Sequence, residues 1–292
     1  MTANTLECRV LLGWMSRHQA VQFLLNEARL ECDLSIGQAE DLWREYRAQV
    51  DALPSRNDDR ARTFELDAAD REIETEFRRA HPEAAELTGF IRIHPMDLQV
   101  HQLQVVTDSS LVLARNMEQD GWLKTALPEE PQSHPIRWRA GQSQLIFELP
   151  HPEFVLTAPA PPDARMQIAP LPGWVSAARF EGRTLLVNGY HRTFAWVSRS
   201  HRAPGNSRED SLLFPLSSVL PFPDPPDEHT REVLLGARPP RFGDFFDARL
   251  AYPARLAKYT HYEMRVRVEI VGVRAAEAQQ TPNKKAAVSL PS

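Results

Sequence analysis

One block near the middle of the chain predicts a strand, a tight turn, a second strand, a glycine corner and a helix in direct succession. Trp174 to Phe180 and Arg183 to Val187 are strand candidates, and Glu181-Gly182 between them suits a hairpin turn. Asn188-Gly189 then ends the second strand with residues that tolerate a positive φ. The apolar stretch Phe194 to Val197 predicts the helix that follows. A chain that contains this block combines a β-hairpin with a helix, which predicts the α+β class.

The predicted corner has the chemistry of an anion site. Backbone N–H groups and the positive end of the helix dipole meet at a helix N-terminus. Gly189 has no side chain, so we expect a ligand to approach the backbone closely there. Arg192 offers a planar fork of donors that fits a phosphate, His191 can donate from a ring nitrogen, and Thr193 adds a hydroxyl.

The corner also resembles the glycine box of the ParB/sulfiredoxin superfamily. Gly189-Tyr190-His191-Arg192 keeps three of the four residues of the sulfiredoxin G-C-H-R box and the terminal arginine of the ParB G-E-R-R box. It is closer still to the D-G-H-H-R variant of ParB-like proteins, with Asn188 at the aspartate position and Tyr190 at that of the first histidine. The resemblance covers about 45 residues, roughly 173–217.

This resemblance implies a mixed-sheet domain that binds nucleotide phosphates through Gly189, His191 and Arg192. The candidate ligand-binding set is the whole corner: Asn188, Gly189, Tyr190, His191, Arg192 and Thr193. Two departures limit what the resemblance implies. Tyr190 replaces the sulfiredoxin cysteine, so sulfinic-acid reduction is not expected. No helical domain is predicted after Pro226, so ParB-type binding of centromeric DNA is not expected either.

Around the block, the chain predicts a helical N-terminal region at 1–87, a ParB/sulfiredoxin-like α+β domain at 88–274 and a disordered tail at 275–292. Ser16 is a candidate N-cap, and Ser35 with Gln38 has the spacing of a capping box. The helix that Ser35 opens is amphipathic, with an apolar face that includes Leu42, Trp43 and Tyr46. This face either packs into the core or docks a partner protein.

Short strands are predicted after residue 88, and prolines then predict two extended connections. The strand candidates are Phe90 to Ile93, Leu103 to Val106, Ile136 to Arg139, Leu145 to Leu149 and Met264 to Ile270. The first connection runs from Pro159 to Pro172, and the second from Pro215 to Pro226.

Composition and charge exclude several classes of protein. The 292 residues contain no apolar run long enough to span a bilayer, and the N-terminus lacks the pattern of a secretory signal. Two cysteines, Cys8 and Cys32, cannot form a disulfide framework or a zinc knuckle, so we expect a reducing cytoplasm. Residues 1–100 carry 12 Lys/Arg and 19 Asp/Glu, and residues 101–292 carry 22 and 20. Neither part is a basic surface, so duplex DNA is disfavoured as a partner.

The sequence selects no catalytic residue. NTP hydrolysis or phosphoryl transfer would use a nucleoside triphosphate with magnesium and would need carboxylates. The candidates are Asp163, Glu181, Asp244 and Asp247, and their spacing favours none of them. The ten histidines form no metal-ligand motif.

Three functions therefore remain open. The leading one is a cytoplasmic nucleotide- or phosphate-binding protein, with or without turnover. The second is a non-enzymatic adaptor that uses the fold as a scaffold and docks a partner in a larger assembly through its N-terminal helices. The third is a nuclease. Independently of these functions, the structural alternative for His191 and Arg192 is that they only cap a helix and pair with a carboxylate.

Overall fold

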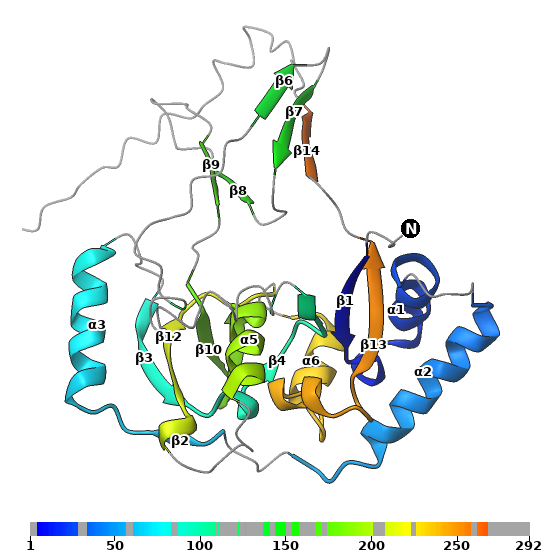
Figure 1. The fold of residues 1–292 in the computed structure, drawn as a ribbon, viewed down its shortest axis with the longest axis horizontal. Coiled ribbons are helices and arrows are strands. Elements are labelled where there is room, and N and C mark those ends of the chain that lie inside the picture. Colours follow the sequence, from blue (N-terminus) through cyan, green and yellow to red (C-terminus); the bar gives the residue numbers. More distant parts are fainter. Residues whose placement is uncertain are drawn as a thin grey trace, which may run out of the picture. The chain divides into compact units, whose positions relative to one another are not determined.

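The computed structural model shows an α+β protein with two compact units, residues 1–132 with 154–259 and residues 133–153 with 260–292 (Figure 1). The structure describes residues 5–28, 34–56, 61–82, 87–108, 110, 122, 126, 137–140, 144–149, 154–157, 167–170, 174–200, 208–222, 226–257 and 262–267. The predicted tail at 275–292, Cys32 and Asp163 lie outside these residues. Within the described ranges, no helix is long and apolar enough to cross a membrane.

A six-stranded mixed sheet carries the predicted hairpin. Its order is β2-β3-β12-β10-β11-β4. The strands are β2 (Thr63–Phe64), β3 (Leu87–Ile93), β4 (Gln99–Val100), β10 (Ser176–Phe180), β11 (Arg183–Asn188) and β12 (Leu212–Ser217). β10 runs parallel to β12, and β11 runs parallel to β4, whereas the β10–β11 and β3–β12 pairs are antiparallel.

A second, three-stranded sheet joins the two ends of the first unit. Its order is β13-β1-β5, with β1 (Thr5–Val10), β5 (Gln104–Val106) and β13 (Tyr252–Ala257). β1 pairs with β13 along its whole length. The alternation of Leu6, Cys8 and Val10 is the period of a half-buried strand, and sequence reasoning missed it. The N-terminal 87 residues are thus not only helical, and the first unit spans both of the predicted regions.

Two of the α-helices, α1 (Arg17–Gln22) and α2 (Ile36–Asp51), begin at the predicted caps Ser16 and Ser35. The other α-helices described are α3 (Ala68–Ala80), α5 (Tyr190–Ser200) and α6 (Glu228–Leu235). Ser16 and Ser35 each accept a hydrogen bond from the backbone N–H three residues later, and both capping boxes are complete. A π-helical segment, η2 (Phe23–Glu27), continues α1, and short 3₁₀ helices occur at η1 (Leu12–Trp14), η3 (Pro95–Asp97), η4 (Arg208–Asp210) and η5 (Phe242–Phe246).

The apolar face of α2 packs inside the molecule. Leu42, Trp43 and Tyr46 pack against a buried cluster that contains residues of β1 and β13. The Trp43 indole N–H donates to the Met15 carbonyl at 3.1 Å, and the Tyr46 ring meets Tyr252 edge to face. Of the two interpretations of this face, core packing is the one that the structure confirms, so the face does not serve as an open docking surface.

The second predicted connection begins too early in the chain, because Pro215 lies inside β12 and the strand ends at Ser217. Pro215 faces Phe90 of β3, and the parallel pairing of β12 with β10 begins only at the next residue, Leu216. Proline has no backbone N–H to donate, and it is tolerated in a strand where no neighbour needs that donor.

The remaining strands form two small sheets. In the second unit, β6 (Arg137–Ala140), β7 (Gln144–Leu149) and β14 (Tyr262–Arg267) are antiparallel in the order β14-β7-β6. β8 (Phe154–Thr157) pairs with β9 (Gln167–Pro170) in the first unit. The sequence predicts β6, β7 and β14 within two or three residues of their ends.

Candidate functional site

The hairpin and the corner form as predicted. Glu181 and Gly182 have φ angles of 45° and 79°, the positive values that a type I′ hairpin turn requires at both central positions. β11 ends at Asn188, Gly189 follows with φ 89°, and α5 begins at Tyr190 without an intervening loop. The strand therefore passes into the helix through a single residue in the left-handed region.

Gly189 is required for packing as well as for its φ angle. It is buried, and a Cβ added to it would lie 2.5 Å from Cγ2 of Val175, closer than real side chains pack. The space that the sequence interpretation reserved for a ligand is filled by this valine. The glycine thus makes room for the core, and not for a ligand, on that side of the backbone.

Asn188 holds the corner together through its side-chain amide. Its Nδ2 donates to the Trp174 carbonyl at 3.1 Å, and its Oδ1 accepts the Gly189 N–H at 2.6 Å. These bonds connect the end of β11 to the residue just before the hairpin. The predicted flanking ligand residue therefore also has a structural role in the corner.

Tyr190 is buried, and its hydroxyl bonds to groups of the protein itself, so it has a structural role that the candidate ligand set did not assign to it. Its hydroxyl donates to the Leu186 carbonyl at 2.8 Å and accepts the backbone N–H groups of His101 and Gln102 at 3.1 and 3.3 Å. We call these hydrogen bonds of the Tyr190 hydroxyl the latch. Burial raises the pKa of this phenol above its usual range, so it remains neutral. The latch connects the first turn of α5 to the turn between β4 and β5.

The imidazole of His101 also contacts the Tyr190 hydroxyl. Its Nδ1 lies 3.0 Å from the Tyr190 hydroxyl, and the two rings meet edge to face. Burial lowers the pKa of His101 to about 4, so this imidazole is neutral at physiological pH. Only the position of His101 in the fold reveals its part in the corner, since 89 residues separate it from Tyr190.

The remaining three residues of the candidate set, Thr193, His191 and Arg192, differ in solvent exposure. Thr193 is fully buried, and its Oγ1 has no hydrogen-bond partner among the residues that the structure describes. Its hydroxyl is thus not presented to solvent, unlike the donor that we expected. His191 and Arg192 are partly exposed in the first turn of α5. Together with Asn188, which is also partly exposed, these two side chains are the part of the candidate set that reaches the surface.

The N-cap of α5 differs from those of the other α-helices that the structure describes. The Thr193 N–H donates to the Gly189 carbonyl at 2.9 Å, which makes Gly189 the N-cap residue. The other N-caps are Ser16, Ser35, Asp67 and Asp227, and each accepts a backbone N–H of its own helix. A glycine has no side chain to do this, so α5 begins without an anion or hydroxyl from its own N-cap.

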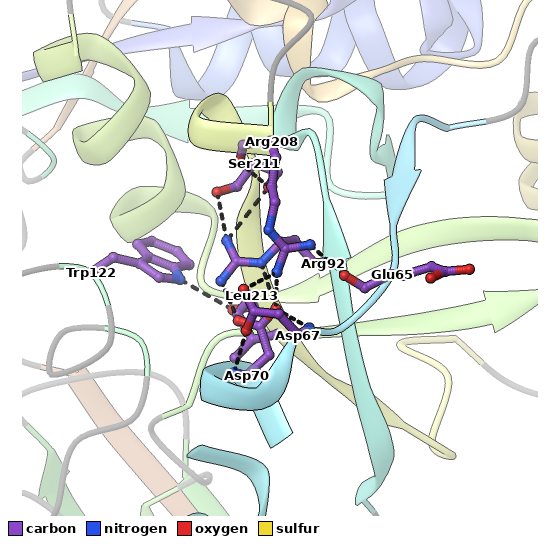
Figure 2. A network of polar contacts seen from close by, with 8 residues as sticks. All are labelled: Glu65, Asp67, Asp70, Arg92, Trp122, Arg208, Ser211 and Leu213. Atoms are coloured by element: carbon purple, nitrogen blue, oxygen red, sulfur yellow. Dashed lines mark hydrogen bonds and ion pairs between the residues drawn. The ribbon is translucent and has the colours of Figure 1, made fainter. Parts of the chain in front are cut away.

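A second helix N-terminus, that of α3, holds an ion-pair network that the sequence did not predict (Figure 2). Asp70 is 1% exposed and accepts two bonds from the Arg92 guanidinium, with its Oδ2 2.9 Å from Nε. Arg208 reaches both Asp67 and Asp70, at 2.7 and 2.6 Å. The Arg92 guanidinium is the largest cause of the lowered pKa of Asp70. The network connects β3, α3 and η4.

The carboxylates proposed for catalysis are paired with arginines wherever the structure describes them. Glu181 pairs with Arg231 at 3.1 Å. Asp244 forms two bonds with Arg56, at 2.7 and 2.9 Å, and Asp247 pairs with Arg249 at 2.7 Å. No group of three or more His, Cys, Asp or Glu within the described part of the chain could hold a metal ion. Burial also raises the pKa of the Cys8 thiol to about 12, so this thiol is unreactive.

No protein-family model matches the chain, and no significantly similar protein was found among the curated proteins or the solved structures. The function proposed below therefore rests on the geometry of the corner and on the resemblance of its residues to a known box.

Proposed function

We propose that the protein binds a nucleotide or another phosphorylated ligand at the N-terminus of α5, with the phosphate against His191 and Arg192. The single observation that carries the proposal is the glycine N-cap of α5. Because Gly189 brings no side-chain acceptor, the positive end of this helix is complemented by an external anion. The partly exposed guanidinium of Arg192 and imidazole of His191 lie in the same turn.

The resemblance to the ParB/sulfiredoxin box supports the same ligand class. The hairpin, the positive φ of Gly189 and the immediate start of α5 are the context in which that box would bind a phosphate. We accordingly propose a ParB/sulfiredoxin-like domain around the six-stranded sheet. In this proposal Asn188 and Tyr190 shape the corner, and His191 and Arg192 contact the ligand.

The proposal is one of binding and includes no chemical step. The described residues do not form a magnesium cage, and Glu181, Asp244 and Asp247 each neutralise an arginine. Magnesium would thus arrive on the phosphates of a nucleoside triphosphate, as is common for this cation.

A thermal-shift titration tests the proposal. Melting temperatures would be measured with ATP, CTP, GTP, UTP and inorganic tripolyphosphate, each with and without magnesium. A ligand at 100 times its dissociation constant stabilises the folded state by about 2.7 kcal/mol, which raises the melting temperature measurably. We expect a shift in the wild type and its loss in Arg192→Ala, whose melting temperature without ligand stays near that of the wild type.

Arg199→Ala is the matched control, because it removes the same charge from the exposed last turn of the same helix. We expect this variant to keep the shift. If none of the five probes stabilises the wild type, or if both variants respond alike, the corner is not a phosphate site.

A further inference from the structure

Phe246 is a large apolar side chain at the surface close to the proposed site. It ends η5 and is 37% exposed, although its neighbours Phe242 and Phe245 are buried. One exposed apolar residue is ordinary in a soluble protein. Phe246 differs because its ring is stacked on the side chain of a core residue.

That side chain is Phe194 of α5. The two rings are nearly parallel, with centroids 4.6 Å apart and an interplanar angle of 13°. Phe194 is 7% exposed and belongs to the main core cluster, so it forms a fixed base under Phe246. One face of the Phe246 ring therefore rests on α5, and its exposed surface belongs to the opposite face and the edge.

The helix repeat places Phe194, on which the Phe246 ring is stacked, on the same side of α5 as His191. Phe194 follows His191 by three residues, and positions three apart are neighbours on one side of a helix. Five residues separate Phe194 from the N-cap Gly189, which corresponds to about 7.5 Å along the axis. A sugar and a phosphate chain can span that separation. A nucleotide whose phosphate lies at the corner is therefore long enough to place its base beside Phe194 and the Phe246 ring stacked on it.

We propose that Phe246 is the stacking surface for the base of a nucleotide, so that the ligand of the corner is a nucleotide and not a simple phosphate. This inference rests on the proposed function of the corner. An aromatic ring binds any base through its π face, and such contacts typically change affinity about tenfold. We therefore expect a strong preference for nucleotides over polyphosphate, with little discrimination among bases beyond the larger surface of purines.

Calorimetric titration with ATP, CTP and inorganic tripolyphosphate tests this inference. Phe246→Leu keeps an apolar side chain on Phe194 and removes the ring, and Phe246→Trp retains an aromatic surface. We expect Phe246→Leu to weaken nucleotide binding by about tenfold and to leave tripolyphosphate affinity unchanged. Phe246→Trp should bind nucleotides at least as tightly as the wild type. Val219→Ala, at another exposed apolar side chain, is the control that should change neither affinity.

The outcomes separate the two proposals. If the nucleotides and tripolyphosphate bind equally well to the wild type, or if Phe246→Leu weakens both alike, the stacking surface is wrong and the phosphate site stands. If nucleotides and tripolyphosphate all fail to bind, the phosphate site is wrong and the stacking surface with it.

Discussion

The N-termini of α3 and α5 combine the same ingredients in opposite ways. Each places basic side chains near the positive end of a helix. At α3, the chain also supplies the anions, since Asp67 caps the helix and Asp70 accepts from both Arg92 and Arg208. At α5, the N-cap is Gly189, and His191 and Arg192 follow after Tyr190.

The difference shows how a structural cluster of arginines is distinguished from a candidate binding site. The two arginines at α3 are neutralised by carboxylates within the fold, and Asp70 lies beneath them out of contact with water. The network connects β3 and η4 to the start of α3, and an external anion would have to displace Asp67 or Asp70. At α5 the N-cap residue itself brings no carboxylate that would compete with an external anion.

Asp70→Ala should have the largest effect on stability, because it removes the carboxylate that neutralises Arg92 and Arg208 at the N-terminus of α3. Removing one partner of a buried ion pair leaves the other charge uncompensated, and Asp70 has two arginine partners. We expect a loss of about 3–4 kcal/mol in the free energy of unfolding, measured by urea denaturation. A loss below about 1 kcal/mol would show that Arg92 and Arg208 find other partners.

The pH dependence of the free energy of unfolding, compared between the wild type and Asp70→Ala, gives a second readout. The pKa of Asp70 lies below its ordinary value of 3.8, so its ion pairs stabilise the folded state fully above that pH. The stability difference between wild type and Asp70→Ala should thus be constant near neutral pH. It should shrink as the pH falls below about 3.8 and the carboxylate becomes protonated. A difference that grows with acidity would contradict this assignment.

Gly189→Ala should have the next largest effect, because it tests whether the glycine serves the core. The variant combines a left-handed backbone, which costs about 1–2 kcal/mol without glycine, with a Cβ 2.5 Å from Val175. We expect a loss of about 2–3 kcal/mol in the free energy of unfolding.

A double-mutant cycle with Val175→Ala separates the two causes. Val175→Ala removes the two γ carbons at 2.5 and 2.7 Å but keeps the Cβ at 2.8 Å, so it relieves part of the clash and none of the backbone strain. Gly189→Ala should therefore cost less in the Val175→Ala background, and additive losses would mean that the γ carbons of Val175 contribute nothing to the cost. Gly182→Ala, also at a positive φ but with open space around its Cβ, is the control for backbone strain without a clash.

The corner could be predicted because everything that shapes its backbone is local in sequence. Glu181-Gly182 defines the turn, and Asn188-Gly189 defines the exit from the strand. The caps at Ser16 and Ser35 were predicted for the same reason, since each is complete within four residues. Signals of this kind do not depend on the rest of the fold.

The roles of individual side chains at the corner could not be predicted, because they depend on distant partners. Val175 fills the space beside Gly189, and Tyr190 accepts hydrogen bonds from residues almost 90 positions away. The α3 network likewise joins Asp70 to Arg208, 138 residues later. Pro215 was misplaced because its tolerance in β12 depends on where the neighbouring strand begins to pair. A sequence shows residue types, whereas burial and partners follow only from the fold.

Tyr190→Phe should have the smallest of these effects, and it tests whether this residue belongs to the fold or to the ligand. The variant removes the hydroxyl and leaves the N–H groups of His101 and Gln102 without their described partner, whereas the Leu186 carbonyl keeps its hydrogen bond with the His101 side chain. Unsatisfied buried groups of this kind cost about 1–2 kcal/mol in the free energy of unfolding. Tyr46→Phe is the matched control, because no described residue forms a hydrogen bond with the Tyr46 hydroxyl.

Because Tyr190 acts as a latch, we expect Tyr190→Phe to bind ATP with nearly wild-type affinity in the calorimetric titration, whereas Arg192→Ala does not. Tyr46→Phe should change neither stability nor affinity. A Tyr190→Phe variant with unchanged stability and greatly weakened ATP binding would return this hydroxyl to the ligand. In that case the interior of the corner, and not only its outer edge at His191 and Arg192, would take part in binding.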